Sequence, residues 1–166
     1  ELEPDTTCYG GAYDKYGLFG QTPTLMAHCC YTDGEEMELM RKNGVYVVHC
    51  PMSNSNLSSG MAPIRKFLNA GIPVALGTDV SADHHMSTLR VMQYAIQVSK
   101  LNYAQTKGEM PFLSLSEVFY LATKGGGSFF GKVGSFEPGY EFDALLIDDS
   151  YLNYDHYTLP QRLERY

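Results

Sequence analysis

The sequence lacks long apolar runs and clusters of basic residues. A membrane-spanning helix needs about 18 consecutive apolar residues, and no segment approaches that length. Lys and Arg number 12 against 19 Asp and Glu, which gives a net charge of −7. Because a duplex DNA or RNA surface needs clustered Lys and Arg, this balance argues against a nucleic-acid-binding protein. The sequence also has no low-complexity tract and no repeat of fixed period.

Cysteine is scarce as well. The four cysteines form no C-x-x-C pair and no zinc-finger spacing. This pattern favours a reduced, cytoplasmic setting. The first six residues have neither the basic start nor the apolar core of a signal peptide, and the chain does not begin with Met. We therefore expect the chain to begin inside a larger protein.

The residues that are present indicate a globular α/β domain. Apolar residues make up 44% and charged residues 19% of the 166 positions, which is enough for one domain with its own core. Short apolar runs alternate with amphipathic segments. Strands are expected at 24–27, 45–48 and 72–76, and helices at 35–43, 61–70 and 87–104. This alternation implies a parallel sheet with right-handed crossovers.

Other segments have weaker patterns. Ser114 and Glu117 have the spacing of a capping box that begins a further helix. We expect a polar loop over 50–60 and a strand over 142–147, outside the alternating pattern. Residues 1–23 are expected to be a loop or the tail of a helix. The tail, 151–166, carries no assignment.

Three chemically capable residues follow the three expected strands. His28, His49 and Asp79 each lie at or just past the carboxyl end of a strand, which is the edge where α/β proteins build their sites. His and Asp are the usual ligands and proton carriers of hydrolytic zinc sites. Each residue alone also fits a structural role, as a core histidine, a turn residue or a loop cap. The three together favour a site, and we expect their side chains to face a common cleft.

Composite motifs surround these residues. The run H-C-P-M-S-N (49–54) is followed by L-S-S-G (57–60) and then by L-G-T-D-V-S (76–81). In this order the motifs resemble the amidohydrolase deaminases that act on purines and triazines. M-A-H (26–28) resembles the preceding strand of that family. The later segment 133–147, with its G-x-x-x-P-G-x-x-F-D-A-L-L pattern, is most similar to guanine deaminases.

The resemblance implies a fold and a reaction. The expected fold is the C-terminal part of a TIM (β/α)8 barrel, its last three strand–helix units, over residues 1–131, with 132–166 starting a return to a small β-sandwich. The expected reaction, in an intact protein, is zinc-dependent hydrolysis of guanine to xanthine and ammonia, using one zinc ion, in a homodimer formed through the barrel. The alternatives are a deaminase of adenosine derivatives or triazines, and a non-catalytic fragment.

The resemblance also implies residue roles. Asp79 matches the aspartate that binds zinc and takes a proton from the attacking water. His28 matches the histidine that contacts this water or the substrate, and it is the second candidate for binding zinc. His49 matches a histidine with a structural or supporting role. Ser53 and Asn54 are expected to shape their loop through side-chain to backbone bonds, and His84 is a candidate substrate contact.

The sequence departs from the family pattern in two ways. Cys29 and Cys30 stand where many relatives have glycine after the histidine, and Ala82-Asp83 stands where many have Gly-Gly, which leaves the backbone freedom of both loops in question. No H-x-H and no H-x-x-E occurs. A catalytic zinc site usually has three protein ligands, and at most two are visible here. We therefore expect the chain alone to bind zinc weakly or not at all and to be inactive.

Overall fold

A computed structural model describes residues 4–152 and 156–166 of the chain. The α-helices and strands are α1 (Tyr9–Lys15), β1 (Leu25–Ala27), α2 (Gly34–Asn43), β2 (Tyr46–His49), α3 (Pro51–Asn56), α4 (Ile64–Asn69), β3 (Val74–Leu76), α5 (Thr88–Gln105), α6 (Leu115–Tyr120) and α7 (Leu159–Arg165). A π-helical turn, η1 (Leu121–Gly125), and two 3₁₀ turns, η2 (Ser128–Phe130) and η3 (Ser150–Leu152), complete the elements.

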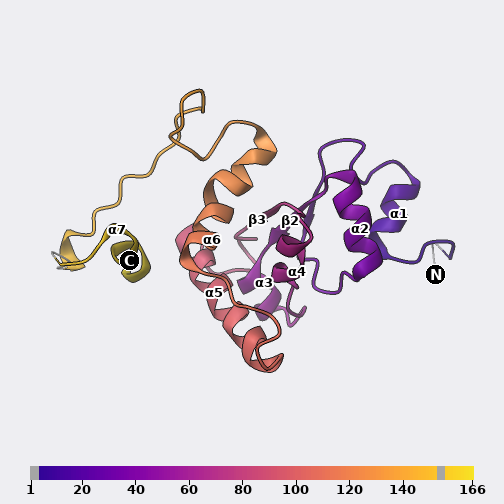
Figure 1. The fold of residues 1–166 in the computed structure, drawn as a ribbon, viewed down its shortest axis with the longest axis horizontal. Helices are drawn as coiled ribbons and strands as arrows, with labels where there is room; N and C mark the ends of the chain where they lie inside the picture. Colours follow the sequence, from indigo (N-terminus) through magenta and orange to yellow (C-terminus); the bar gives the residue numbers. More distant parts are fainter. Residues whose placement is uncertain (1–3, 153–155) are drawn as a thin grey trace.

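The three strands form one parallel sheet in the order β1-β2-β3. Leu25 pairs with Tyr46, and Val47 pairs with Val74. In Figure 1, α1 and α2 stand at one side of the sheet, while α5 and α6 stand at the other. The alternating pattern of the sequence therefore folds as expected into a mixed α/β structure.

Local signals fix the element ends. The Asp33 side chain accepts a hydrogen bond from the Glu36 backbone N–H at 2.9 Å and caps α2, which ends at Gly44 with φ 66°. Ser114 and Glu117 form the expected capping box of α6. The core that these elements enclose is almost wholly aliphatic and aromatic. Its fully buried members include Phe19, Met40, Val45, Val47, Phe67, Ile72, Val91, Ala95, Leu113, Val118 and Leu121.

Two expectations about elements are wrong. The expected polar loop contains α3, because Pro51 occupies the first turn of a helix, where its fixed φ is favourable, and residues 51–54 are buried. The expected strand over 142–147 is not a strand. All six residues are exposed, and none of the residues that the structure describes supplies a neighbouring strand to pair with them. A strand needs such a neighbour to satisfy its backbone groups.

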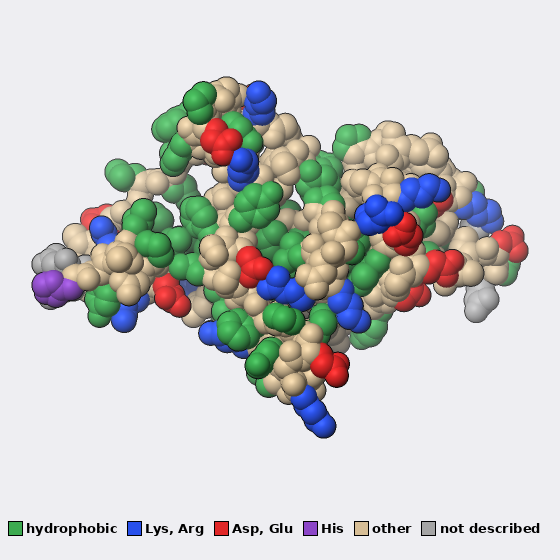
Figure 2. Space-filling model, in the orientation of Figure 1, with side chains coloured by type: hydrophobic (Ala, Val, Ile, Leu, Met, Phe, Trp, Pro, Cys, Tyr) green, Lys and Arg blue, Asp and Glu red, His purple; other side chains and the backbone are tan. Residues whose placement is uncertain are grey.

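The C-terminal arm, residues 131–152, runs away from the sheet toward α7 (Figure 1). Apolar side chains reach the surface along it (Figure 2), including Phe136, Phe142, Leu145 and Leu146. No helix within 4–152 or 156–166 combines the length and the apolar character needed to cross a membrane.

Candidate active site

Two of the expected site residues face each other. His28 follows β1 and Asp79 lies shortly after β3, and the His28 Nε2 and Asp79 Oδ2 atoms are 3.9 Å apart. Their side chains are 43% and 40% exposed, so a ligand can reach both. The parallel strands thus bring this histidine and this carboxylate to one edge of the sheet, as predicted.

Both residues have a left-handed backbone. The φ angle is 70° at His28 and 50° at Asp79, and Cys29 next to His28 has φ 49°. Residues other than glycine rarely adopt this region, and such strain is concentrated at functional sites. Cys29 therefore adopts a backbone geometry that glycine takes more readily.

Helix α3 supplies a hydrogen-bond partner to each of these side chains. Asn54 Oδ1 lies 2.8 Å from His28 Nδ1, and Ser53 Oγ donates to Asp79 Oδ2 at 2.5 Å. Ser53 and Asn54 are 0% and 2% exposed. The sequence indicated that they would bond to the backbone of their own loop, whereas their side chains contact the two facing residues.

The facing pair fits a zinc ion as part of its ligand set. When Asn54 Oδ1 accepts the Nδ1 proton of His28, Nε2 carries a lone pair directed toward a carboxylate oxygen. An imidazole nitrogen and a carboxylate oxygen are both donor atoms that zinc takes, and both side chains are accessible to a ligand. Within the described residues, no group of three His, Cys, Asp or Glu is placed to hold an ion.

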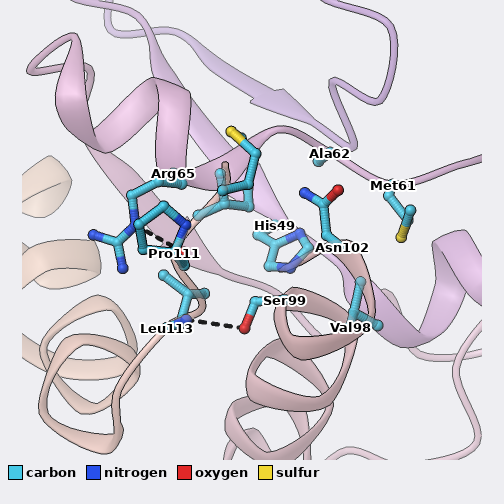
Figure 3. Close-up of a pocket in the computed structure, with 11 residues that line it drawn as sticks. His49, Met61, Ala62, Arg65, Val98, Ser99, Asn102, Pro111 and Leu113 are labelled. Carbon is cyan, nitrogen blue, oxygen red and sulfur yellow. Dashed lines mark hydrogen bonds between the residues drawn. The ribbon is translucent and has the colours of Figure 1, made fainter. Parts of the chain in front are cut away.

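His49 lies elsewhere. It is 2% exposed, and its ring lines a cavity of about 20 Å³ together with side chains around α4 and α5 (Figure 3). Successive strand residues point to opposite faces, so His49 shares the buried face of Val47. Burial lowers the pKa of the His49 imidazole to about 3, and its buried Nδ1 has no hydrogen-bond partner among residues 4–152 and 156–166. The expectation that all three side chains face one cleft therefore fails for His49.

The loop after β3 is held partly by Asp83, which the sequence indicated only as a departure from the family pattern. Asp83 is buried, and its Oδ1 accepts a hydrogen bond from the His85 backbone N–H at 3.0 Å. Asn56 of α3 donates to the Ala82 carbonyl at 2.7 Å. His84 is exposed, and its Nε2 lies 3.5 Å from Asn56 Nδ2, at the rim of this loop.

The neighbouring thiols are protonated near neutral pH. Burial raises the pKa of the Cys29 thiol to about 12. Burial, followed by the nearby Asp79 carboxylate, raises that of Cys50 to about 11.

The chain is similar to several known deaminases. The chain is 39% identical over 150 residues to human guanine deaminase, covering 89% of this chain and 33% of that protein. A crystal structure of guanine deaminase from C. acetobutylicum with guanine in its active site superposes with a TM-score of 0.96 at 57% identity, covering 99% of this chain and 39% of that one. A zinc-bound adenosine deaminase from Xanthomonas campestris gives a TM-score of 0.77 at 26% identity, covering 92% of this chain and 35% of that one.

The chain therefore spans between a third and two fifths of the length of these relatives. The sequence pattern of the amidohydrolase family matches residues 5–163, which is nearly the whole chain. From this match, and from the facing histidine and aspartate at the strand ends, the chain belongs to the amidohydrolase family.

Proposed function

We propose that the protein containing this chain hydrolyses guanine to xanthine and ammonia, with zinc as its metal. The observation that carries the proposal is the facing pair of His28 and Asp79 in a chain that is 57% identical to a guanine-bound deaminase. Relatives named for adenosine derivatives are 33% and 35% identical, and triazine hydrolase variants are 26% and 27% identical. All of these values lie below 57%, so adenosine derivatives and triazines are less favoured substrates.

The proposed setting of the site is a (β/α)8 barrel. Residues 1–131 would form its last three strand–helix units, and 132–166 would begin the return to a β-sandwich. The three parallel strands with their crossover helices support the first assignment. The exposed apolar arm supports the second, because it offers side chains that a neighbouring sheet would cover. A homodimer through the barrel and a cytoplasmic location complete the proposal, the latter supported by four free cysteines.

Zinc would be held by His28 Nε2 and Asp79 Oδ2, with further ligands from outside this chain. When bound, it would supply a Lewis acid that makes water acidic near neutral pH. The residues of this chain then have three tasks. Asp79 accepts a proton from the attacking water, His28 presents Nε2 to the same space, and Ser53 holds the carboxylate oxygen through its 2.5 Å hydrogen bond.

The reaction balances without an oxidant or a reductant. The water oxygen forms a bond to the guanine carbon that bears the exocyclic amine, and the bond from that carbon to the amine nitrogen breaks. The proton taken by Asp79 is passed to the leaving nitrogen, which departs as ammonia. General-base help of this kind is worth about 10²–10⁴-fold in rate.

A substrate panel tests the proposal. The intact protein, loaded with zinc, would be assayed for ammonia release from guanine, adenosine and an aminotriazine at equal concentrations. The expected result is turnover of guanine, with xanthine appearing in equal amount to ammonia. Turnover of adenosine or the triazine with none of guanine would refute the substrate, and no ammonia from any of them would refute the deaminase.

A further inference from the structure

We infer that helix α3 (Pro51–Asn56) is a positioning element of the site, in which Asn54 selects the protonated nitrogen of His28 and Ser53 sets the orientation of the Asp79 carboxylate. The inference rests on the proposed function for its kinetic consequences, whereas the state of the imidazole can be observed without any substrate.

Geometry gives the first argument. Ser53 and Asn54 are adjacent on a helix, so their side chains leave it about 100° apart, and each reaches a different strand-end loop. Asn54 Oδ1 is 2.8 Å from His28 Nδ1 after β1, and Ser53 Oγ is 2.5 Å from Asp79 Oδ2 after β3. Asn56 adds a third bond, to the Ala82 carbonyl at 2.7 Å. Three polar residues of one short helix thus connect both loops that carry the facing pair.

Burial gives the second argument. The two facing side chains are 43% and 40% exposed, whereas Ser53 and Asn54 are 0% and 2% exposed. The helix packs against α5, which places it inside the structure. A half-exposed side chain samples several rotamers unless a fixed partner holds it. Buried partners of this kind hold an imidazole or carboxylate in one orientation.

Hydrogen-bond chemistry gives the third argument. An amide oxygen only accepts, so contact with Asn54 Oδ1 places the proton of neutral His28 on Nδ1 and leaves the Nε2 lone pair facing Asp79 Oδ2. If the amide were turned over, Nδ2 would donate to Nδ1 and the proton would move to Nε2. Only the first arrangement leaves Nε2 able to accept a proton or bind a metal. The state of His28 is therefore decided by one buried amide.

Among the residues that the structure describes, the buried Nδ2 of Asn54 has no hydrogen-bond partner. Leaving a buried donor unpaired costs free energy. The Oδ1 atom of the same amide is the one that contacts His28 Nδ1.

Nitrogen NMR of the intact protein, with its metal removed by a chelator, tests the inference directly. The chain contains five histidines, so ¹⁵N-histidine labelling gives few signals, and His28→Gln identifies the one of interest. The expected wild-type spectrum, recorded above pH 8, shows His28 protonated at Nδ1 and unprotonated at Nε2. Asn54→Asp, which keeps an accepting oxygen, should retain this pattern, and Asn54→Leu should give a mixture of the two neutral forms. A wild-type proton on Nε2, or an unchanged pattern in Asn54→Leu, would overturn the role of Asn54.

Kinetics provide the second arm. Loss of a residue that holds a reacting group typically costs about 10–100-fold in activity. Asn54→Leu and Ser53→Ala should lower kcat on guanine by this factor while KM changes by less than about threefold. Ser55→Ala is the matched control, because the Ser55 hydroxyl bonds within α3 to the Pro51 carbonyl, and it should leave kcat unchanged.

Two outcomes distinguish a failure of the positioning role of α3 from a failure of the proposed function. If kcat falls only in proportion to the folded fraction, measured by thermal unfolding of each variant, the positioning role is refuted. If the wild-type protein does not turn over guanine, the proposed function fails, and the NMR result still decides whether Asn54 sets the state of His28.

Discussion

At the scale of single residues, the site depends on a strained backbone that carries two reactive side chains. His28 and Asp79 both have positive φ, and each is held by a buried partner. The sequence predicted both positions, because strand ends in α/β proteins are where such residues function. The sequence could not predict that Ser53 and Asn54 contact these two residues. Those contacts depend on helix α3, and the polar pattern of 50–60 predicted a loop instead.

Replacing His28 tests the first of these residues. His28→Ala removes the nitrogen that faces Asp79, and kcat on guanine in the intact protein should fall by about 10²-fold or more. The matched control is His156→Ala, in an exposed turn of the C-terminal tail, which should leave kcat within about twofold. Steady-state ammonia release measures both variants. Equal kcat values for the two variants would remove His28 from the mechanism.

His49 should affect stability instead. Its folded pKa of about 3 lies below the ordinary value of 6.5, so the unfolded chain binds the extra proton first as the pH falls. Stability should therefore decrease progressively from about pH 6.5 down to about pH 3, by at most about 1.4 kcal/mol per pH unit from this group. His49→Gln should reduce that dependence while kcat at pH 7.5 falls only with the folded fraction. Urea unfolding of wild type and variant at pH 5 and pH 7.5 measures this pH dependence of stability. An identical pH dependence in both proteins would contradict the lowered pKa of His49.

At the scale of elements, ionic contacts connect helices that the sequence places far apart. Arg65 of α4 donates to both carboxylate oxygens of Glu117 in α6, at 2.7 and 3.1 Å, and also to the carbonyls of Pro111 and Phe112. The side chains of Arg65 and Glu117 are 17% and 36% exposed, so solvent screens the pair in part. The hydrogen bonds from Arg65 hold the pKa of Glu117 at about 2.

Arg65→Met should therefore lower the free energy of unfolding by about 1–2 kcal/mol at pH 7, after allowance for that screening. The Glu117 contribution is present above its ordinary pKa of 4.5 and is lost as the pH falls toward 2, so the difference between variant and wild type should shrink in that window. Arg90→Met, which removes only an exposed bond to Gln93, is the control and should change stability by less than about 0.5 kcal/mol. A control as destabilised as Arg65→Met would refute the role of the ion pair.

The sequence predicted most elements because their signals are local. The strands have short apolar runs, and the caps at Asp33, Gly44 and Ser114 are visible in the residues themselves. It failed at α3 and at 142–147 because tertiary context decides both. Burial stabilises a helix whose residues are polar, and a strand pattern remains unpaired where no described residue pairs with it.

At the scale of the whole molecule, the proposed site needs more ligands than the described residues of this chain bring together. The chain covers 39% of the guanine-bound relative, and its described residues place only two donors together. We expect the 166-residue chain alone to bind zinc substoichiometrically after dialysis, because two ligands do not compete well with water, and to release no ammonia from guanine. Metal analysis of the chain and of the intact protein, treated identically, measures the difference. One zinc per isolated chain would show that it holds a complete ligand set.

The most direct test of the account is Asp79→Asn in the intact, zinc-loaded protein. The amide keeps nearly the same shape but can neither accept the proton of water nor provide a negative ligand, so kcat for ammonia release from guanine should fall by at least about 10²–10⁴-fold. Asp143→Asn, in the exposed C-terminal arm, controls for the loss of one carboxylate and should retain wild-type kcat. The central claim predicts that the two variants differ by this factor with equal folded fractions. Asp79→Asn turnover within tenfold of the control would contradict it.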